Sequence, residues 1–342
     1  MADDQQIRQQ IVDAIIKAEA QMEFSTYLHP ANEKEQKEKF LTNEIENPVF
    51  TYGDSQIPSL SFPDFEVKSE IDSLYRDRMG YASGMGFLMQ LIRQDEDFSA
   101  LSQVLFPVSG IEGLSVTKKE PSKSFVTAEQ IADTFRKTLE ECELKDWSVE
   151  LLDECSSRVF VNQWSKKVVI RSNVKLTEDE LESLIRHEIG VHVLRYARGS
   201  MQNEPLLSVG TLLGRLIEEG VACYLENPEG HPRLFLRHFA VETALNNSFR
   251  ETWKLLLEKG CDEEEAWTHV LRVKRGLSDG ASHGAFTKDA SYAQGYEEIK
   301  RYAESGGDFA PLLSAPIHPE EVELLKTEAK MEIYPLPDLL KN

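Results

Sequence analysis

The chain has 342 residues, enough for one large domain or two ordinary ones, and a globular hydrophobic content of 41%. Its formal net charge of −21 argues against nucleic acid, an anionic membrane or an acidic polypeptide as a general partner, but it still allows a local basic patch. The chain has no apolar run of about 18 residues, so we expect no membrane-spanning helix.

The N-terminus and the cysteines indicate where the protein resides. The first residues, MADDQQ, are acidic and lack the hydrophobic segment of a secretory signal. The four cysteines, Cys142, Cys155, Cys223 and Cys261, are dispersed and form no C-x-x-C motif. We therefore expect reduced thiols and a cytoplasmic protein.

The first third of the chain is predicted to be mostly helical. Apolar residues recur at helical spacing over residues 4–22 and again over residues 67–105. We expect the second helical stretch to break near Gly80 and near Gly84-Met85-Gly86, because glycine disfavours a helix interior. Nothing in this part of the sequence is typical of catalysis.

We therefore predict an N-terminal helical region over residues 1–120 and a catalytic region over residues 121–342, which together form one compact unit. Residues 147–152, 158–162 and 167–171 read as strands, and the last two resemble a hairpin.

Residues 176–195 read LTEDELESLIRHEIGVHVLR and are predicted to form a helix. Thr177 and Glu180 have the spacing of a capping box at its N-terminus. Apolar residues recur at three- and four-residue spacing, and Glu188 lies on their stripe. A carboxylate is costly to bury there unless something binds it.

Two imidazoles accompany this glutamate, in an H-E-x-x-x-H arrangement of His187, Glu188 and His192. The usual zinc helix is H-E-x-x-H, in which both histidines share one face and the glutamate is the base. The extra residue places the histidines about 140° apart around a regular helix, so they could not share one ion. A one-residue π-bulge would bring them back into register, and Gly190 would ease this distortion. The alternative is that the pair arises by chance.

A second helix is predicted over residues 206–225, and it offers a third metal ligand. Glu219 lies on its apolar stripe, whereas Glu218 faces another way and is expected to pair with Arg215 in solvent. We select Glu219 because a catalytic zinc site needs three protein ligands, such as two histidines and a glutamate. The alternative is that Glu219 only pairs with Arg215. Two glycines on this run would let it approach the first helix closely.

Residues 272–296 are punctuated by glycine and rich in polar side chains. A zinc peptidase needs a donor for the developing oxyanion, and a carboxypeptidase also needs a cation for the terminal carboxylate. Tyr292 is the candidate for the first role, and Lys288 or Arg275 for the second. The alternative is two surface cations and a half-buried tyrosine.

Taken together, these residues resemble the DUF1704 family, which includes the microtubule-associated tyrosine carboxypeptidases and many bacterial proteins named for a QEGLA motif. The resemblance covers roughly residues 5–325 and consists of Pro30-Ala-Asn32, His187-Glu-Ile-Gly-Val-His192, Glu219-Gly-Val-Ala222, Arg275-Gly276, and Phe286-Thr-Lys-Asp289 with Tyr292. Two departures are mild: Glu218 stands where many bacterial members have Gln, and Val221 replaces Leu.

The resemblance implies that His187, His192 and Glu219 bind one catalytic Zn²⁺ and that Glu188 is the general base. The family removes a C-terminal residue, which is the tyrosine of α-tubulin in the animal members. This chain shows no long basic extension, and its acidic charge argues against microtubule binding. The carboxypeptidase chemistry therefore transfers better than the tubulin substrate.

We thus expect an α+β, mostly helical, zincin-like metallopeptidase with a small antiparallel or mixed sheet. Its substrate would be a peptide or protein C-terminus, from which it removes tyrosine or another residue. Two other readings remain open. A catalytically silent, zinc-stabilised binding or regulatory protein would carry the same residues. An aminopeptidase or dipeptidyl peptidase can also use a lengthened H-E-x-x-x-H helix.

Overall fold

The computed structural model describes residues 2–22, 27–53, 60–111, 125–153 and 157–341. It is mostly helical with two small sheets, which confirms the predicted α+β class. The first half contains the elements α1 (Ala2–Glu19), α3 (Glu33–Leu41), α4 (Glu70–Gln90), α5 (Asp95–Leu105), β1 (Phe125–Val126), α6 (Ala128–Glu141), β2 (Ser148–Leu152), β3 (Val159–Asn162) and β4 (Lys167–Arg171).

The second half carries the functional motifs. It contains β5 (Leu176–Thr177), α7 (Glu178–His187), η1 (Glu188–Val193), α8 (Leu194–Gly199), η2 (Pro205–Ser208), α9 (Leu212–Glu226), α10 (Pro232–Ala244), α11 (Phe249–Glu258), α12 (Glu263–Lys274), η3 (Thr287–Asp289), α13 (Ala290–Glu304), α14 (Phe309–Leu312), η4 (Pro319–Glu321), α15 (Val322–Thr327) and η5 (Asp338–Leu340). No helix of the described part is long and apolar enough to cross a membrane.

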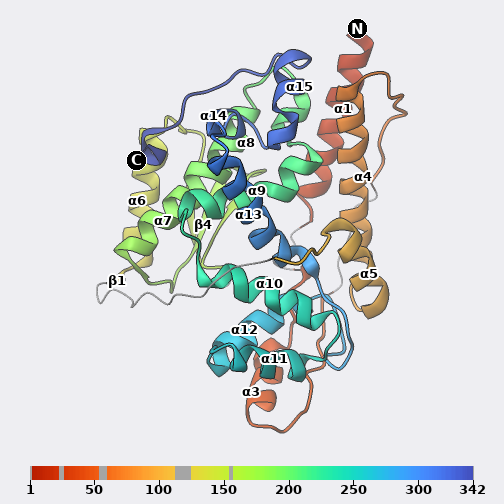
Figure 1. Ribbon diagram of the computed structural model, residues 1–342, viewed down its shortest axis with the longest axis vertical. Coiled ribbons are helices and arrows are strands. Elements are labelled where there is room, and N and C mark those ends of the chain that lie inside the picture. Colours follow the sequence, from red (N-terminus) through yellow and green to blue (C-terminus); the bar gives the residue numbers. More distant parts are fainter. Residues whose placement is uncertain (1, 23–26, 54–59, 112–124, 154–156, 342) are drawn as a thin grey trace.

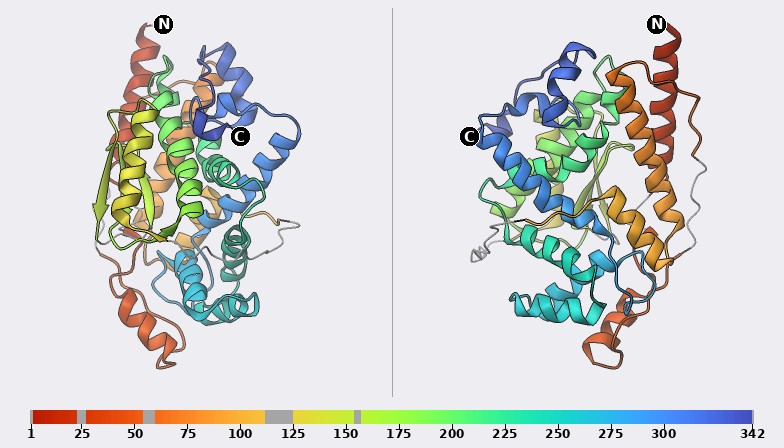
Figure 2. Two further views of the ribbon diagram at one scale, coloured as in Figure 1. Left: turned by 90° about the vertical axis from the view of Figure 1, so that its left-hand side faces the viewer. Right: turned by 45° about the vertical axis from the view of Figure 1, so that its right-hand side comes forward.

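The larger sheet has the strand order β2-β4-β3, in which β2 runs parallel to β4 and β3 runs antiparallel to it. The predicted hairpin is therefore confirmed, and its turn contains Lys166 with a positive φ of 52°. The sheet lies at one side of the molecule next to α6 and α7 (Figure 2, left). Its apolar side chains share one core with α6 and with the helix that bears the H-E-x-x-x-H motif.

Two large cores and one small cluster accompany this core in the described part of the chain. One combines α1 and α4 with α9, α13 and the C-terminal helices, and α1 and α4 run side by side (Figure 1). The other joins α3 and α5 to α10, α11 and α12. The boundary predicted near residue 120 falls among residues that the structure does not describe, and it remains a prediction. Cys142 and Cys223 are free thiols and Cys261 is buried, whereas Cys155 lies outside the described residues.

Three helix boundaries differ from the prediction. The helix α4 runs unbroken through its glycines. The missing side chains of Gly84 and Gly86 make room for Leu105 and Leu60, which pack against the helix there. The run after residue 206 is a short 3₁₀ turn, and α9 begins only after Gly210, whose φ is +74°. The helical sequence of residues 234–259 is divided between α10 and α11, because a capping box at Ser248 starts a new helix there.

The glycines of α9 also act differently from the prediction, which placed them against the first helix. A Cβ at Gly214 would lie 2.0 Å from the carbonyl oxygen of Pro316, and one at Gly220 would lie 2.2 Å from the carbonyl carbon of Gly295. The Gly220–Gly295 contact lets α9 and α13 cross almost backbone to backbone. This contact therefore fixes the position of Tyr292 on α13 relative to Glu219 on α9.

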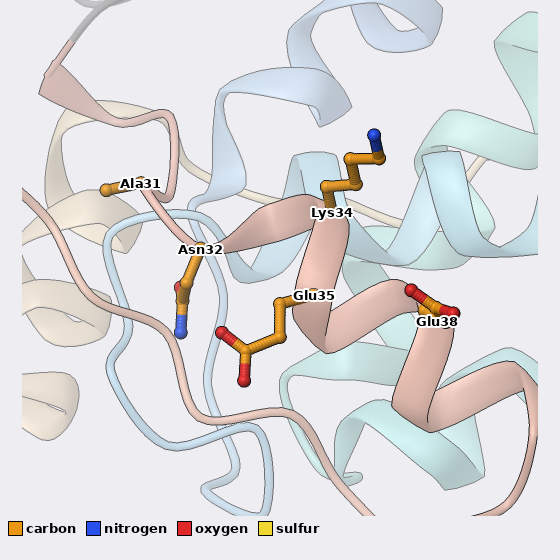
Figure 3. Close-up of a pocket in the computed structure, with 5 residues that line it drawn as sticks. All are labelled: Ala31, Asn32, Lys34, Glu35 and Glu38. Carbon is orange, nitrogen blue, oxygen red and sulfur yellow. The ribbon is translucent and has the colours of Figure 1, made fainter.

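A hollow of about 410 Å³ opens along α3, at the end of the molecule away from α7 and α9 (Figures 1 and 3). Ala31, Asn32, Lys34, Glu35 and Glu38 line it. Asn32 belongs to the early motif noted above, and its side-chain amide pairs with the backbone of Val49 and Thr51 at 2.9 and 3.0 Å. Its role is therefore to hold the connection between α3 and α4.

We predict that Gly220→Ala destabilises the protein by at least about 2 kcal/mol, because a backbone–backbone contact cannot make room for a methyl group. Gly80→Ala is the matched control: its Cβ would meet nothing within 4 Å, and alanine favours a helix over glycine by about 1 kcal/mol. Denaturant unfolding measures both variants. A Gly220→Ala variant as stable as the wild type would contradict the close crossing.

Candidate metal centre

The segment that carries the two histidines is a helix with a π-helical turn in its middle. The capping box of Thr177 and Glu180 starts α7 as predicted. The turn over Glu188–Val193 is π-helical, and α8 continues from it, so the predicted π-bulge is confirmed. Gly190 lies in this turn, where a Cβ would come within 2.9 Å of Leu339 Cδ1.

The π turn brings the two imidazoles together. The ring centroids of His187 and His192 lie 5.0 Å apart. Nε2 of each ring lies 3.7 Å from the same oxygen, Oε2 of Glu219. These three atoms lie within 4.8 Å of one another, so the three predicted metal ligands do converge.

This donor set fits a divalent ion such as zinc. Zinc bonds of about 2.0–2.1 Å in a tetrahedron place neighbouring ligand atoms about 3.4 Å apart, close to the 3.7 Å separations in this site. Two neutral imidazoles and one carboxylate are also the ligands of many catalytic zinc sites. The three side chains extend from two helices that pack against each other, α7–η1 and α9.

Each imidazole uses its other nitrogen to bind a second carboxylate. Nδ1 of His192 lies 2.9 Å from Glu218 Oε1, and Nδ1 of His187 lies 2.9 Å from Glu226 Oε2. Such outer carboxylates orient metal-binding histidines and leave Nε2 free to coordinate. Burial opposes a charge on both rings, but the surrounding carboxylates outweigh it and raise the pKa of His187 to about 10 and that of His192 to about 9.

Glu218 thus differs from its prediction. It does pair with Arg215, with 3.3 Å between Nη1 and Oε2, but Glu218 is buried and Arg215 is half-buried rather than in solvent, and Tyr196 also donates to Glu218 at 3.1 Å. The apolar stripe of α9 did not predict this, because the face that bears Glu218 and Arg215 is also covered, by Tyr196 of α8 and Glu19 of α1. The alternative that Glu219 only pairs with Arg215 is also not what the structure shows, since Glu219 faces the two histidines.

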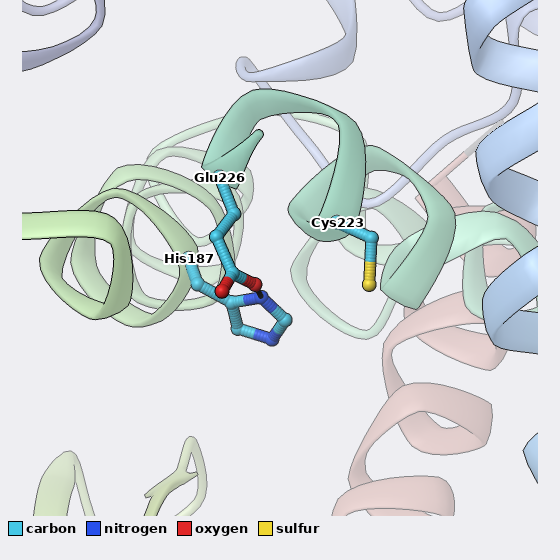
Figure 4. A group of neighbouring side chains, drawn as sticks. All are labelled: His187, Cys223 and Glu226. Carbon is cyan, nitrogen blue, oxygen red and sulfur yellow. Dashed lines mark hydrogen bonds and ion pairs between the residues drawn. The ribbon is translucent and has the colours of Figure 1, made fainter. Parts of the chain in front are cut away.

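A second group of possible ligands consists of His187, Cys223 and Glu226. Figure 4 shows the Glu226 carboxylate against the His187 ring, with the Cys223 thiol beside it, one turn earlier on α9. Burial and the neighbouring carboxylates raise the pKa of the Cys223 thiol. Glu226 already binds His187 Nδ1, which favours an orienting role over coordination.

Glu188 is buried at the start of the π turn, between the two histidines in sequence. Burial raises the pKa of its carboxyl group, and the charges of Glu219 and Glu226 add to this effect, whereas the histidines oppose it. A carboxylate with a raised pKa is a better base for a proton transfer near neutral pH.

The glycine-rich block forms the other wall of the site. Lys288 Nζ lies 3.9 Å from Glu219 Oε1, and 41% of its side chain is exposed. Burial and the charge of Glu219 raise the pKa of Tyr292, which therefore stays protonated. The guanidinium of Arg237 stacks on the Tyr292 ring at 4.4 Å from its centroid.

Arg275 belongs to a cluster of ion pairs around Asp289. Asp289 receives a bidentate pair from Arg272 at 2.7 and 2.9 Å and a longer contact from Arg275 Nη2 at 3.7 Å. Although Asp289 is buried, these two cations hold its pKa below the usual range. Sequence reasoning missed Arg272, Arg237 and Glu226. Only Glu226 left a signal, since it follows Glu219 by seven residues and so shares its helical face.

Comparisons with known proteins point to one family. Residues 71–341 match the family model described as microtubule-associated tyrosine carboxypeptidase. The chain is 30% identical to microtubule-associated tyrosine carboxypeptidase 1 of Mus musculus over 177 residues, which cover 47% of this chain and 36% of that protein. The Homo sapiens protein of the same name is 29% identical over 178 residues, with the same coverage. The chain thus matches little more than a third of the length of these relatives.

We predict that Glu218→Gln weakens zinc binding by about 10- to 100-fold, the usual effect of losing an outer carboxylate behind a ligating histidine. Competition with a chromogenic chelator measures the affinity. Glu182→Gln is the matched control, because Glu182 lies exposed on α7 and pairs only with Arg186 among the contacts of its side chain in the described chain. Equal affinities for the Glu218 variant and the control would contradict the orienting role.

Proposed function

The chain belongs to the microtubule-associated tyrosine carboxypeptidase family, and from this premise we propose that it is a zinc-dependent carboxypeptidase. It would remove the C-terminal residue of a peptide or protein. One observation carries the proposal: the π turn aims Nε2 of His187 and His192 at one oxygen of Glu219. Relatives named as tyrosine carboxypeptidases make tyrosine the first residue to test. The free thiols suit the predicted cytoplasmic location.

Zinc, when bound by His187, His192 and Glu219, would supply Lewis-acid chemistry. Glu188 would take a proton from the attacking water and pass it to the amine of the leaving residue. Because burial raises the pKa of Glu188, its carboxyl group can hold the proton between these two transfers. The outer carboxylates Glu218 and Glu226 would hold the two imidazoles in place throughout.

Tyr292 would donate its phenolic hydrogen to the oxyanion that develops on the scissile carbonyl. Its raised pKa keeps that hydrogen in place, and the stacked Arg237 restricts the movement of the ring. The close crossing of α9 and α13 fixes the distance between this hydroxyl and the metal ligands. The three features support a donor that is ready before the substrate arrives.

Lys288 is the better candidate of the two cations for the terminal carboxylate of the substrate. Its ammonium lies beside Glu219 and is accessible, whereas Arg275 is drawn towards the Arg272–Asp289 pair and stacks on Phe286. The cations on this wall also favour a free carboxylate over the free amine that an aminopeptidase must hold. The net charge of −21 supports a substrate other than the intact microtubule surface.

We expect Glu188→Gln to reduce the release of C-terminal tyrosine from a peptide by about 10²- to 10⁴-fold, the usual contribution of a general base. Mass spectrometry of the peptide products measures this, with Glu182→Gln as the control. If the zinc-loaded wild type cleaves no peptide of a free-carboxylate library, the protein is instead a silent binding module.

Lys288→Ala should raise KM for peptides with a free C-terminal carboxylate by about 10- to 100-fold, because a charge-assisted hydrogen bond is lost. Any slow cleavage of C-terminally amidated peptides should be unchanged. Lys326→Ala, which removes an exposed lysine of α15 that pairs with Glu323, is the matched control. An equal loss on free and amidated peptides would contradict the carboxylate-binding role.

A further inference from the structure

A line of charged side chains connects the end of the N-terminal helix α1 to the metal centre. Glu19, the last residue of α1, accepts a hydrogen bond from Arg78 at 2.6 Å and forms an ion pair with Arg215 at 3.9 Å. Arg215 donates to Glu218 at 3.3 Å, and Glu218 binds Nδ1 of His192 at 2.9 Å. Negative and positive charges thus alternate from α1 to a predicted zinc ligand.

The line lies mostly in the interior, and its most exposed members are Arg215, with 22% of its side chain exposed, and His192, with 14%. The side chains of Glu19 and Glu218 are 8% and 6% exposed, and that of Arg78 is fully buried. Charges in such surroundings are poorly screened, so each one strongly affects its neighbours. The Glu19 Oε2 and Arg215 Nε atoms have no hydrogen-bond partner in the described part of the chain, so they interact chiefly through their charges.

Glu19 balances the charges of both Arg78 and Arg215. Without that balance, the full charge of Arg215 would act on Glu218 and draw it away from the imidazole of His192. The uncompensated guanidinium would also repel a divalent cation held by His192 and Glu219. Both effects weaken metal binding, so the direction of the change follows from electrostatics alone.

The helix α1 lies outside the segment that matches the family model, which begins at residue 71. It packs on α4 and η2 (Figure 1) and contributes no ligand to the centre. A separate polar anchor of α1, Arg8, binds Asp72 at 2.8 Å and Glu204 at 3.0 Å, and neither partner belongs to the line of charges. The docking of α1 and its electrostatic effect can therefore be separated by mutation.

We propose that Glu19 is a positioning residue for the zinc ligand His192, and that the docked α1 raises the affinity of the site for zinc through Arg215 and Glu218. This inference rests on the proposed function, because it requires zinc at His187, His192 and Glu219. Zinc affinity would then depend on a helix outside the family-matched segment.

The test compares zinc affinities of full-chain variants by chelator competition, with the melting temperature of each zinc-free protein as a measure of folding. Glu19→Gln should bind zinc about 10-fold more weakly than the wild type, by analogy with outer-shell losses. Glu19→Asp, which keeps the charge, should recover most of the affinity. Arg8→Met should lower the melting temperature by removing the ion pairs with Asp72 and Glu204, but it leaves Glu19 beside Arg215 and should keep the wild-type affinity for zinc.

Three results would count against the account, and they can be told apart. A wild type without measurable zinc affinity would overturn the proposed function itself. A wild type that binds zinc with a Glu19→Gln variant of equal affinity would overturn only the role of Glu19. Equal losses in Glu19→Gln and Arg8→Met would show that α1 acts merely as a structural brace.

Discussion

The π-helical turn at Glu188–Val193 is the constraint on which the rest of the site depends. A regular helix would point His187 and His192 about 140° apart, and no third ligand could then serve both. The wider turn moves both rings to the side that faces α9, where Glu219 completes the set. Such a turn loses regular hydrogen bonds and is maintained by its surroundings, which include the sheet, α9 and the C-terminal segment.

Buried charge is the second organising feature. Three carboxylates surround the two imidazoles, and each of them has a distinct partner: Glu219 faces both Nε2 atoms, while Glu218 and Glu226 bind one Nδ1 each. This excess of negative charge suits a cation in the centre. The opposite wall is positive, with Lys288 and the arginines around Asp289, and it suits an anionic end of a substrate. The polarity of the site thus matches carboxypeptidase chemistry.

Much of this could be predicted from sequence because it depends on local signals. Capping boxes fix the start of helices, alternating apolar residues mark the hairpin, and the spacing of His187 and His192 itself demands a bulge. Glu218 was misplaced because a helical stripe shows only which face is apolar. It cannot show that Tyr196 and the end of α1 cover another face. The glycines of α4 and α9 were misread for the same reason, since what they contact is distant in sequence.

The most direct test of the central claim is X-ray absorption spectroscopy of the zinc-loaded protein. Our account predicts a shell of nitrogen and oxygen ligands at about 2.0–2.1 Å, with the multiple scattering of two imidazoles and no sulfur. A sulfur ligand at about 2.3 Å would place the ion at Cys223 instead, and a single imidazole would show that the π turn does not unite the two histidines.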